Sequence, residues 1–355
     1  MADVTLQSIT KRFGKITALD DVSFSIHDGE FFVLLGPSGA GKTTTLRVIA
    51  GLEHQDAGTV TFDGTSAESL TTPERDVAFV FQQYSLYPTM SVYDNLAFPL
   101  RAPGRRIAED EIKRRVGEAA EKLRINHLLE RKTARLSGGE MQRVSIGRAI
   151  VRDPRIFLMD EPLSNLDFKL REALRVELKH LQKTRASTTL FVTHDQIEAL
   201  TMADRIGVLD HGRVVQIGTP YDIYDRPATT FVAQLVGSPR INLLGAARAE
   251  GSVRVPDSPI AFSLNGLSGA LPREFTLGVR PEDVQPQPDG PFAGTVALIE
   301  PLGVETLVYI KAGAQTLVST VPGMSRLQIG NEVRFGIARE RLHYFGVDGV
   351  RVGAR

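Results

Sequence analysis

The chain has 355 residues, of which 42% are hydrophobic and 24% charged, with 42 basic and 42 acidic side chains. This length accommodates two domains, and a formal net charge of zero gives no general attraction to nucleic acid or anionic lipid. There is no cysteine, which excludes disulfides and sulfur-ligated zinc and is typical of a reducing cytosol. The first 15 residues lack a signal-peptide profile. The longest apolar runs, such as FFVLL at 31–35, are far shorter than the ~18 residues of a spanning helix, so we expect no membrane crossing.

Residues 1–235 mix short apolar runs with helical patterns, which predicts an α/β layered domain. Four compact runs have the composition of buried parallel strands: FFVLL (31–35), VAFVF (77–81), IFLM (156–159) and TLFVT (189–193). Helical spacing of apolar residues predicts two helices between them, marked by Ile112, Val116, Ala119 and Leu123, and by Leu170, Leu174, Leu178 and Leu181.

The pattern of apolar and polar residues changes at about residue 236. The segment GSPRINLLG (237–245) is expected to be a linker, and after it come short alternating segments such as TLVYIKAG and QTLVSTV, interrupted by Gly and Pro. This pattern predicts a small β-rich barrel or sandwich over residues 236–355.

A phosphate-binding loop follows the first of the buried strands. Residues 36–44 fit the pattern G-x-x-x-x-G-K-[ST] between a strand and a helix; they are Gly36, Pro37, Ser38, Gly39, Ala40, Gly41, Lys42, Thr43 and Thr44. The glycines let backbone N–H groups surround a phosphate, and the helix adds its positive end. Lys42 is expected to reach the β- and γ-phosphates, and the Thr43 hydroxyl to ligate Mg²⁺.

Polar side chains follow two other predicted strands. Asp160 and Glu161 come at the end of one, where α/β sheets bind ligands, and His194 follows TLFVT in the same way. We expect Asp160 to hold Mg²⁺, Glu161 to polarise the attacking water and His194 to bond the γ-phosphate or that water. A solvent-facing acid pair and a satisfied strand-end histidine are the alternatives, and the neighbouring phosphate loop disfavours both.

The stretch RLSGGEMQRVSIGRAI (135–150) reads as a loop that enters a helix. Ser137 and two glycines at the helix start predict an anion site. No lysine lies in the turn to complete a phosphate cradle, so this is half of a site.

Together, GPSGAGKT, LSGGE, IFLMDEP, SNLD and FVTHD, in this order, resemble the ATP-binding subunit of an ABC transporter. The likeness covers nearly the whole chain. The segment VFQQYSLYP (80–88) is similar to the Q-loop, and LGVRPEDV (277–284) to the C-terminal β domain of bacterial carbohydrate importers of the maltose and glycerol-phosphate type. The resemblance implies a P-loop ABC ATPase domain with a helical subdomain at about 88–152, followed by an OB-like domain.

The resemblance also implies roles for single residues. Phe13 would stack on adenine, Gln82 would reach Mg²⁺ and the water, and Asp167 would signal across a dimer. A core position is the alternative for Phe13. Ser137, Gly138 and Gly139 would bind the γ-phosphate of ATP held by a second copy. The family usually has Gln where this chain has Glu140, and we expect Glu140 to point toward Arg143 or Arg148 because a carboxylate facing a triphosphate costs Coulomb energy.

By the same resemblance, the chain is expected to hydrolyse ATP with Mg²⁺ as a homodimer at the cytoplasmic face of the inner membrane. Its loop 82–90 would contact two membrane permease subunits, and an extracytoplasmic solute-binding protein would deliver a sugar, polyol or sugar phosphate. The C-terminal domain would stabilise the dimer or sense a regulator, and the sequence does not separate these roles.

Other classes fit less well. A soluble ABC ATPase not coupled to transport is the main alternative. DNA-maintenance members need a long coiled-coil arm, for which the span of 95 positions from Lys42 to Ser137 (137 − 42) is too short. Ribosome-acting members usually have two ATP domains, and neutral charge disfavours a nucleic-acid surface. The β domain disfavours an exporter subunit, and LSGGE and THD disfavour a P-loop kinase.

Overall fold

The computed structural model describes residues 2–102, 105–249, 251–263 and 271–352. The chain divides into two compact units, Met1–Pro220 and Tyr221–Arg355. Within the described ranges, no helix is long and apolar enough to cross a lipid bilayer.

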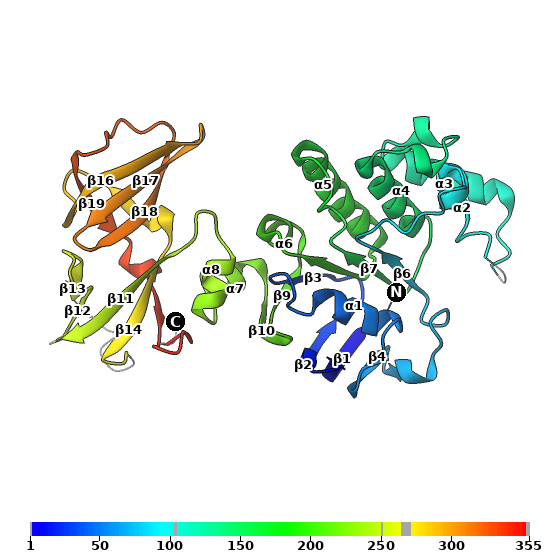
Figure 1. Cartoon of the computed structure of the whole chain (residues 1–355), viewed down its shortest axis with the longest axis horizontal. Coiled ribbons are helices and arrows are strands. Elements are labelled where there is room, and N and C mark those ends of the chain that lie inside the picture. The colour runs from blue at the N-terminus through cyan, green and yellow to red at the C-terminus, as the bar shows by residue number, and fades with distance from the viewer. Residues whose placement is uncertain (1, 103–104, 250, 264–270, 353–355) are drawn as a thin grey trace. The chain divides into compact units, whose positions relative to one another are not determined.

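The first unit contains two sheets and a group of helices (Figure 1). Its strands are β1 (Val4–Phe13), β2 (Ile16–Ile26), β3 (Phe31–Leu35), β4 (Ala57–Phe62), β5 (Thr65–Ser66), β6 (Val77–Val80), β7 (Ile156–Asp160), β8 (Thr189–Thr193), β9 (Arg205–Asp210) and β10 (Arg213–Gly218). Its helices are α1 (Lys42–Ala50), α2 (Val92–Ala97), α3 (Glu109–Lys122), α4 (Gly138–Ile150), α5 (Phe168–Arg185) and α6 (Gln196–Met202).

The larger sheet has the order β10-β9-β3-β8-β7-β6. Strands β9, β3, β8, β7 and β6 run parallel, and β10 pairs antiparallel with β9. The predicted strands at 31–35, 77–81, 156–159 and 189–193 are all confirmed, to within one residue at their ends. β3, β7 and β8 are buried along their whole length, which explains why their sequences are continuously apolar rather than alternating.

Alternate residues of β3 pack on opposite faces of this sheet, as the period of a strand requires. Phe32 and Leu34 join a core that includes Leu46 and Ile49 of α1. Phe31 instead stacks near Phe191, with ring centroids 5.7 Å apart, on the face toward α5. Both faces of the sheet are therefore covered, and the accessible part of the sheet is at the ends of its strands.

Helices α2, α3 and α4 contact one another and form the helical segment of the first unit (Figure 1). The predicted helix at 112–123 is α3, whose Ile112, Val116 and Ala119 are buried. The predicted helix at 170–181 is α5, which buries Leu174, Leu178 and Leu181.

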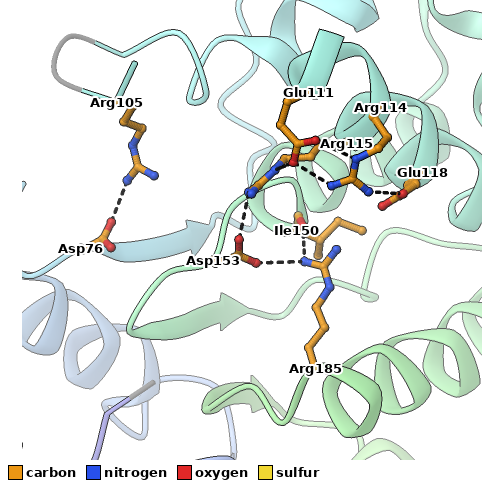
Figure 2. A network of polar contacts seen from close by, with 9 residues as sticks. All are labelled: Asp76, Arg105, Glu111, Arg114, Arg115, Glu118, Ile150, Asp153 and Arg185. Carbon is orange, nitrogen blue, oxygen red and sulfur yellow. Dashed lines mark hydrogen bonds and ion pairs between the residues drawn. The ribbon is translucent and has the colours of Figure 1, made fainter. Parts of the chain in front are cut away.

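Carboxylates and arginines connect α3 to the sheet (Figure 2). Arg115 of α3 lies 2.7 Å from Glu111 and 2.9 Å from Asp153, a residue between α4 and β7. Asp153 also lies 3.8 Å from Arg185 of α5, whose guanidinium donates to the Ile150 carbonyl oxygen at 2.7 Å. The Asp153 side chain is 61% exposed, so each pair adds little stability. The network links α3 to the loop before β7 and to α5.

The second unit is β-rich after two short helices. Its elements are α7 (Pro220–Asp225), α8 (Thr230–Leu235), β11 (Asn242–Ala249), β12 (Ser252–Arg254), β13 (Ala261–Ser263), β14 (Glu274–Val279), β15 (Val284–Pro286), β16 (Phe292–Pro301), β17 (Glu305–Ala312), β18 (Gln315–Pro322), β19 (Glu332–Ile337) and β20 (His343–Phe345). They form sheets in the orders β13-β12-β11-β14-β20 and β15-β19-β16-β17-β18. The predicted segments TLVYIKAG and QTLVSTV are β17 and β18, so the expected OB-like β domain is confirmed.

The junction between the units differs from the sequence expectation in two places. Residues 242–245 were expected in a linker, but they begin β11 and pair with β14. Residues 221–235 were expected in the first domain, but they belong to the second unit. Arg280 connects residues 221–235 to the β strands of the second unit: it is buried and donates hydrogen bonds to the carbonyl oxygens of Ala233, Val236 and Tyr224 at 2.6–3.0 Å.

Candidate active site

The loops that follow β3, β6, β7 and β8 meet at the carboxyl edge of the parallel sheet. They form a cavity of about 380 Å³. Its lining residues are Ile16, Thr17, Ala18, Ser38, Gly39, Gly41, Lys42, Thr43, Thr44, Gln82, Glu161 and His194. The structure therefore brings together the phosphate loop and the side chains that follow three other strands, because parallel strands end at one edge.

Two glycines allow the phosphate loop its close turn. A Cβ atom on Gly36 would lie 2.2 Å from the Leu209 carbonyl oxygen, and one on Gly41 would lie 2.5 Å from that of Ala18. Gly41 also has a φ of 105°, in the left-handed region that favours glycine. Only glycine fits both places, so the loop can curl against β2 and β9 and then enter α1.

Lys42 is the first residue of α1 and is almost fully buried. Its ammonium donates to the carbonyl oxygens of Gly36 at 3.0 Å and Pro37 at 2.9 Å, and it lies 3.7 Å from Glu161 Oε1. Burial lowers the pKa of Lys42, while the carboxylates of Glu161 and Asp160 oppose this shift. The lysine side chain is thus held inside the loop, next to two backbone carbonyl oxygens and the Glu161 carboxylate.

Asp160 and Thr43 supply oxygen atoms next to this lysine. The Thr43 hydroxyl donates to Asp160 Oδ1 at 2.9 Å. Burial raises the pKa of Asp160, and the Thr43 hydrogen bond counteracts it. Among the residues described, no three His, Asp or Glu side chains cluster closely enough to hold a metal ion by themselves. Two hard oxygens beside a phosphate cradle nevertheless fit Mg²⁺, which usually takes few protein ligands along with phosphate and water oxygens.

Glu161 lines the cavity and contacts two of its other polar side chains. Its Oε2 is 3.1 Å from His194 Nδ1 and accepts a 3.4 Å hydrogen bond from the Gln82 side chain. The Glu161 backbone has a φ of 43°, and its N–H donates to the Val192 carbonyl oxygen at 3.0 Å. A positive φ is strained for a residue with a side chain, and such strain is common at active sites. Here it turns the carboxylate from the end of β7 toward the phosphate loop.

Phe13 lies at the turn between β1 and β2 and is 44% exposed, so it is not a core residue. The Lys11 ammonium lies 5.0 Å from its ring centroid. Phe13 does not line the cavity, whereas its strand partner Ile16 does, with Thr17 and Ala18. The sequence analysis missed these three because only strand pairing reveals their position.

Ser137, Gly138 and Gly139 lie at the start of α4, and none of them is among the described residues that line the cavity. The expectation for Glu140 is wrong: its Oε2 accepts hydrogen bonds from the Ser137 N–H at 2.7 Å and hydroxyl at 2.9 Å. In return, the Ser137 hydroxyl accepts from the Glu140 N–H at 3.3 Å, which completes a capping box. The local pattern S-x-x-E would have predicted this arrangement.

The two arginines expected to face Glu140 have other partners. Arg143 donates to the carbonyl oxygens of Leu123 and Arg124, and Arg148 donates to that of Ser85 at 2.7 Å. Backbone carbonyls are acceptors that sequence periodicity does not reveal.

Two further acidic residues, Asp167 and Glu198, make hydrogen bonds at the starts of helices near the cavity. Asp167 caps α5, accepting from the Leu170 N–H at 3.0 Å. Glu198, which the sequence analysis missed, is buried behind His194 and accepts a 2.6 Å hydrogen bond from the Thr193 hydroxyl. Burial raises the pKa of Glu198. Both are at helix starts next to the cavity loops, so both shape the backbone that carries the polar side chains.

The loop 82–90 lies beside a second hollow of about 410 Å³. Apolar side chains, among them Phe79, Phe81, Leu86, Tyr87 and Pro99, line it together with Arg148 and Arg152. The Tyr87 side chain is 40% exposed, yet its backbone is fixed: the Tyr87 N–H donates to Asn95 at 2.9 Å, and its carbonyl oxygen accepts from Thr133 at 2.8 Å. The loop thus presents an aromatic ring on a rigid frame.

The fold and the cavity define a P-loop nucleotide-hydrolysing domain followed by a small β domain. The ABC transporter family matches residues 19–164, and the TOBE domain family matches residues 277–345. The chain belongs to the family of ATP-binding subunits of ABC import systems, whose members are ATPases coupled to transport.

Relatives resemble the chain from end to end. The trehalose/maltose import ATP-binding protein MalK of Thermococcus litoralis is 45% identical over 368 aligned positions, covering 97% of this chain and 98% of the relative. The sn-glycerol-3-phosphate import ATP-binding protein UgpC 3 of Agrobacterium fabrum is 45% identical, covering 99% and 100%. A solved dimeric ATP-binding cassette, MJ0796 bound to ADP and Pi, is 33% identical with a TM-score of 0.56, over 61% of this chain and 98% of that one.

Proposed function

We propose that this chain hydrolyses ATP at the cavity beside Lys42 and thereby powers solute import through membrane permeases. The observation that carries the proposal is the convergence of Lys42, Gln82, Glu161 and His194 on one cavity. The cavity combines a phosphate-binding loop, the Glu161 carboxylate and two further polar side chains, Gln82 and His194. Phosphoryl transfer to water requires groups of these kinds.

In this mechanism the Glu161 carboxylate accepts a hydrogen bond from the attacking water and takes its proton as the water oxygen bonds to the γ-phosphorus. The bond from the γ-phosphorus to the bridging oxygen breaks, and ADP leaves with that oxygen. Lys42 and the loop N–H groups offset the charge on the phosphates. His194 and Gln82 orient the Glu161 carboxylate.

Mg²⁺, held by Thr43 and Asp160 with Gln82 nearby, would supply further charge neutralisation at the phosphate oxygens. The 2.9 Å contact between Thr43 and Asp160 supports this assignment. Phe13, exposed at the turn before the cavity strand, is the proposed adenine-stacking residue. Stacking of this kind contributes about 1–3 kcal/mol per base in nucleic-acid systems.

The site is completed by a second copy of the chain. Ser137, Gly138 and Gly139 form a helix start with donors but without a lysine, and they lie outside the cavity of their own chain. We place them against the γ-phosphate bound at the partner's phosphate loop, with Asp167 near the junction. ATP binding then closes the dimer, and hydrolysis opens it.

The loop 82–90 and the hollow beside it form the proposed contact with two permease subunits. A partly exposed aromatic ring next to arginines, on a backbone held by hydrogen bonds, has the composition of a protein interface. The chain would then sit at the cytoplasmic face of the inner membrane, held by the permeases, with an extracytoplasmic solute-binding protein on the far side. MalK and UgpC relatives are import subunits for trehalose/maltose and sn-glycerol-3-phosphate. They support a sugar, polyol or sugar phosphate as the solute.

The test is Glu161→Gln in the purified chain, with Glu172→Gln, an exposed acid of α5, as the matched control. We expect turnover to fall by about 10²-fold or more in the first variant, with ATP binding retained and dimers accumulating. The control should keep normal turnover. Normal ATPase activity in Glu161→Gln would overturn the assignment.

A further inference from the structure

The Glu140 carboxylate occupies both donors of Ser137. The Ser137 N–H and hydroxyl end on the same oxygen, Glu140 Oε2, at 2.7 and 2.9 Å. Ser137 is exposed, as a residue must be to meet a second molecule. An anionic oxygen of this chain therefore already sits where the proposed site would receive an anionic oxygen of ATP.

The Glu140 carboxylate and the γ-phosphate of ATP cannot both accept a hydrogen bond from the Ser137 hydroxyl. The Ser137 hydroxyl has a single hydrogen, and it is donated to Glu140. A γ-phosphate oxygen can accept it only after the carboxylate leaves or the hydroxyl turns away. The carboxylate also places a negative charge beside an arriving triphosphate, which is unfavourable over a few ångströms.

We propose that Glu140 is an internal competitor of ATP at Ser137, so that the dimer closes only when the carboxylate is displaced from the serine. This inference rests on the proposed composite site and adds to it a residue that sets the ATP concentration needed for closure. Glu140 is a positioning residue in this scheme, since it acts through Ser137.

The groups around Glu140 keep its side chain ionised. The Ser137 N–H hydrogen bond is the main cause of a lowered Glu140 pKa, with Arg131 and Arg143 contributing positive charge nearby. The side chain therefore remains a carboxylate at neutral pH and does not yield its position by protonation. Arg131 and Arg143 attract the carboxylate in its observed position, so ATP has to compete with this attraction as well as with the two hydrogen bonds from Ser137.

The experiment compares dimer formation in chains that bind ATP without hydrolysing it. In a Glu161→Gln background, Glu140→Gln is the informative change, because glutamine can keep the capping box but carries no charge. Glu121→Gln, an exposed acid of the helical segment, removes the same charge elsewhere. Dimer fraction is measured by light scattering after gel filtration over a range of ATP concentrations and at low and high salt.

We expect Glu140→Gln to lower the ATP concentration for half-maximal dimerisation by about tenfold, and Glu121→Gln to leave it within about twofold. The gap between the Glu140→Gln chain and its parent should narrow at high salt, because salt screens the carboxylate. If the variant acted only by weakening the Ser137–Glu140 capping box, the difference in ATP requirement between variant and parent would not narrow at high salt. Glu140→Ala should also lower the ATP requirement, at the cost of a lower melting temperature.

The inference is overturned if Glu140→Gln leaves the ATP requirement unchanged or raises it while the parent dimerises normally. That result leaves the composite site intact. If the parent itself forms no ATP-dependent dimer, the composite site is wrong and the role of Glu140 falls with it.

Discussion

The hydroxyl of Ser145, midway along α4, donates a 2.9 Å hydrogen bond to the carbonyl oxygen of Tyr84. Arg148, one turn further on, donates to the Ser85 carbonyl oxygen at 2.7 Å. Tyr84 and Ser85 both have positive φ, at 40° and 50°, so these bonds hold a strained turn. The helix that begins at Ser137 is thus tied directly to the loop after Gln82. A shift of α4 on ATP binding would carry the proposed permease loop with it.

Ser145→Ala should loosen this turn. Ser145 is buried, and its loss leaves the Tyr84 carbonyl oxygen with only the long 3.5 Å hydrogen bond from Arg148, which costs about 1 kcal/mol of unfolding free energy. Amide hydrogen exchange should accelerate at residues 83–87. Ser69→Ala is the matched control, because the Ser69 hydroxyl makes an exposed 2.8 Å bond to the Ser66 carbonyl oxygen. Equal protection of the loop in both variants would contradict the link.

Mixing two inactive chains tests the shared site. Lys42→Ala removes the phosphate lysine and Ser137→Arg blocks the donor half, so each chain alone should have little ATPase activity. In a mixed dimer one site is intact. Random pairing of two-fold dimers then restores at most about a quarter of normal activity, measured by phosphate release. Normal hydrolysis by either variant alone would rule out the composite arrangement.

A charge on the loop 82–90 should weaken binding to the permeases. Tyr87→Glu and Leu86→Glu each replace an apolar side chain of the hollow by a carboxylate, in a lining that also includes Arg148 and Arg152. Desolvation of the added charge and loss of the apolar contact oppose docking. We expect copurification of permeases from membranes to fall at least about tenfold, while ATPase activity of the isolated chain stays within about twofold. Tyr221→Glu, a change at an exposed aromatic of the second unit, is the comparison. Undiminished assembly of the loop variants would refute the contact.

The second unit should become more stable at mildly acidic pH. Burial raises the pKa of Asp283 to about 6, against the opposing charge of Arg341, which lies 3.2 Å away. A raised carboxyl pKa means that the folded chain binds the proton more tightly, so stability rises as pH falls from about 7 toward the unfolded pKa near 4. Asp283→Asn should remove this dependence and stabilise the unit by about 1–3 kcal/mol at pH 7.

Calorimetry of the full chain at pH 5 and pH 7 measures this effect through the transition of the second unit. Asp257→Asn, a change at an exposed acid of the same unit, should leave the pH dependence in place. An Asp283→Asn chain with the same pH dependence as the parent would show that this carboxylate is not its source.

The sequence alone determined the elements whose signal is local. Continuous apolar runs gave β3, β7 and β8 because buried parallel strands have no polar face. The spacing of Gly36, Gly41 and Lys42 identified the phosphate loop because few other residues allow its backbone path. Polar residues directly after strands could be assigned to one edge by the general geometry of parallel sheets.

Tertiary structure decided the features that depend on partners far away in the chain. Ile16 lines the cavity because β2 lies beside the phosphate loop, and Arg148 turns to the Ser85 carbonyl oxygen rather than to Glu140. Arg280 connects α7 and α8 to the β strands of the second unit through hydrogen bonds to backbone 44–56 residues away. The type and spacing of residues show which face of a helix or strand is apolar. Every residue has the same backbone carbonyl, however, so the sequence does not show which carbonyl accepts a given hydrogen bond. Only the fold determines which carbonyl lies within reach of each donor.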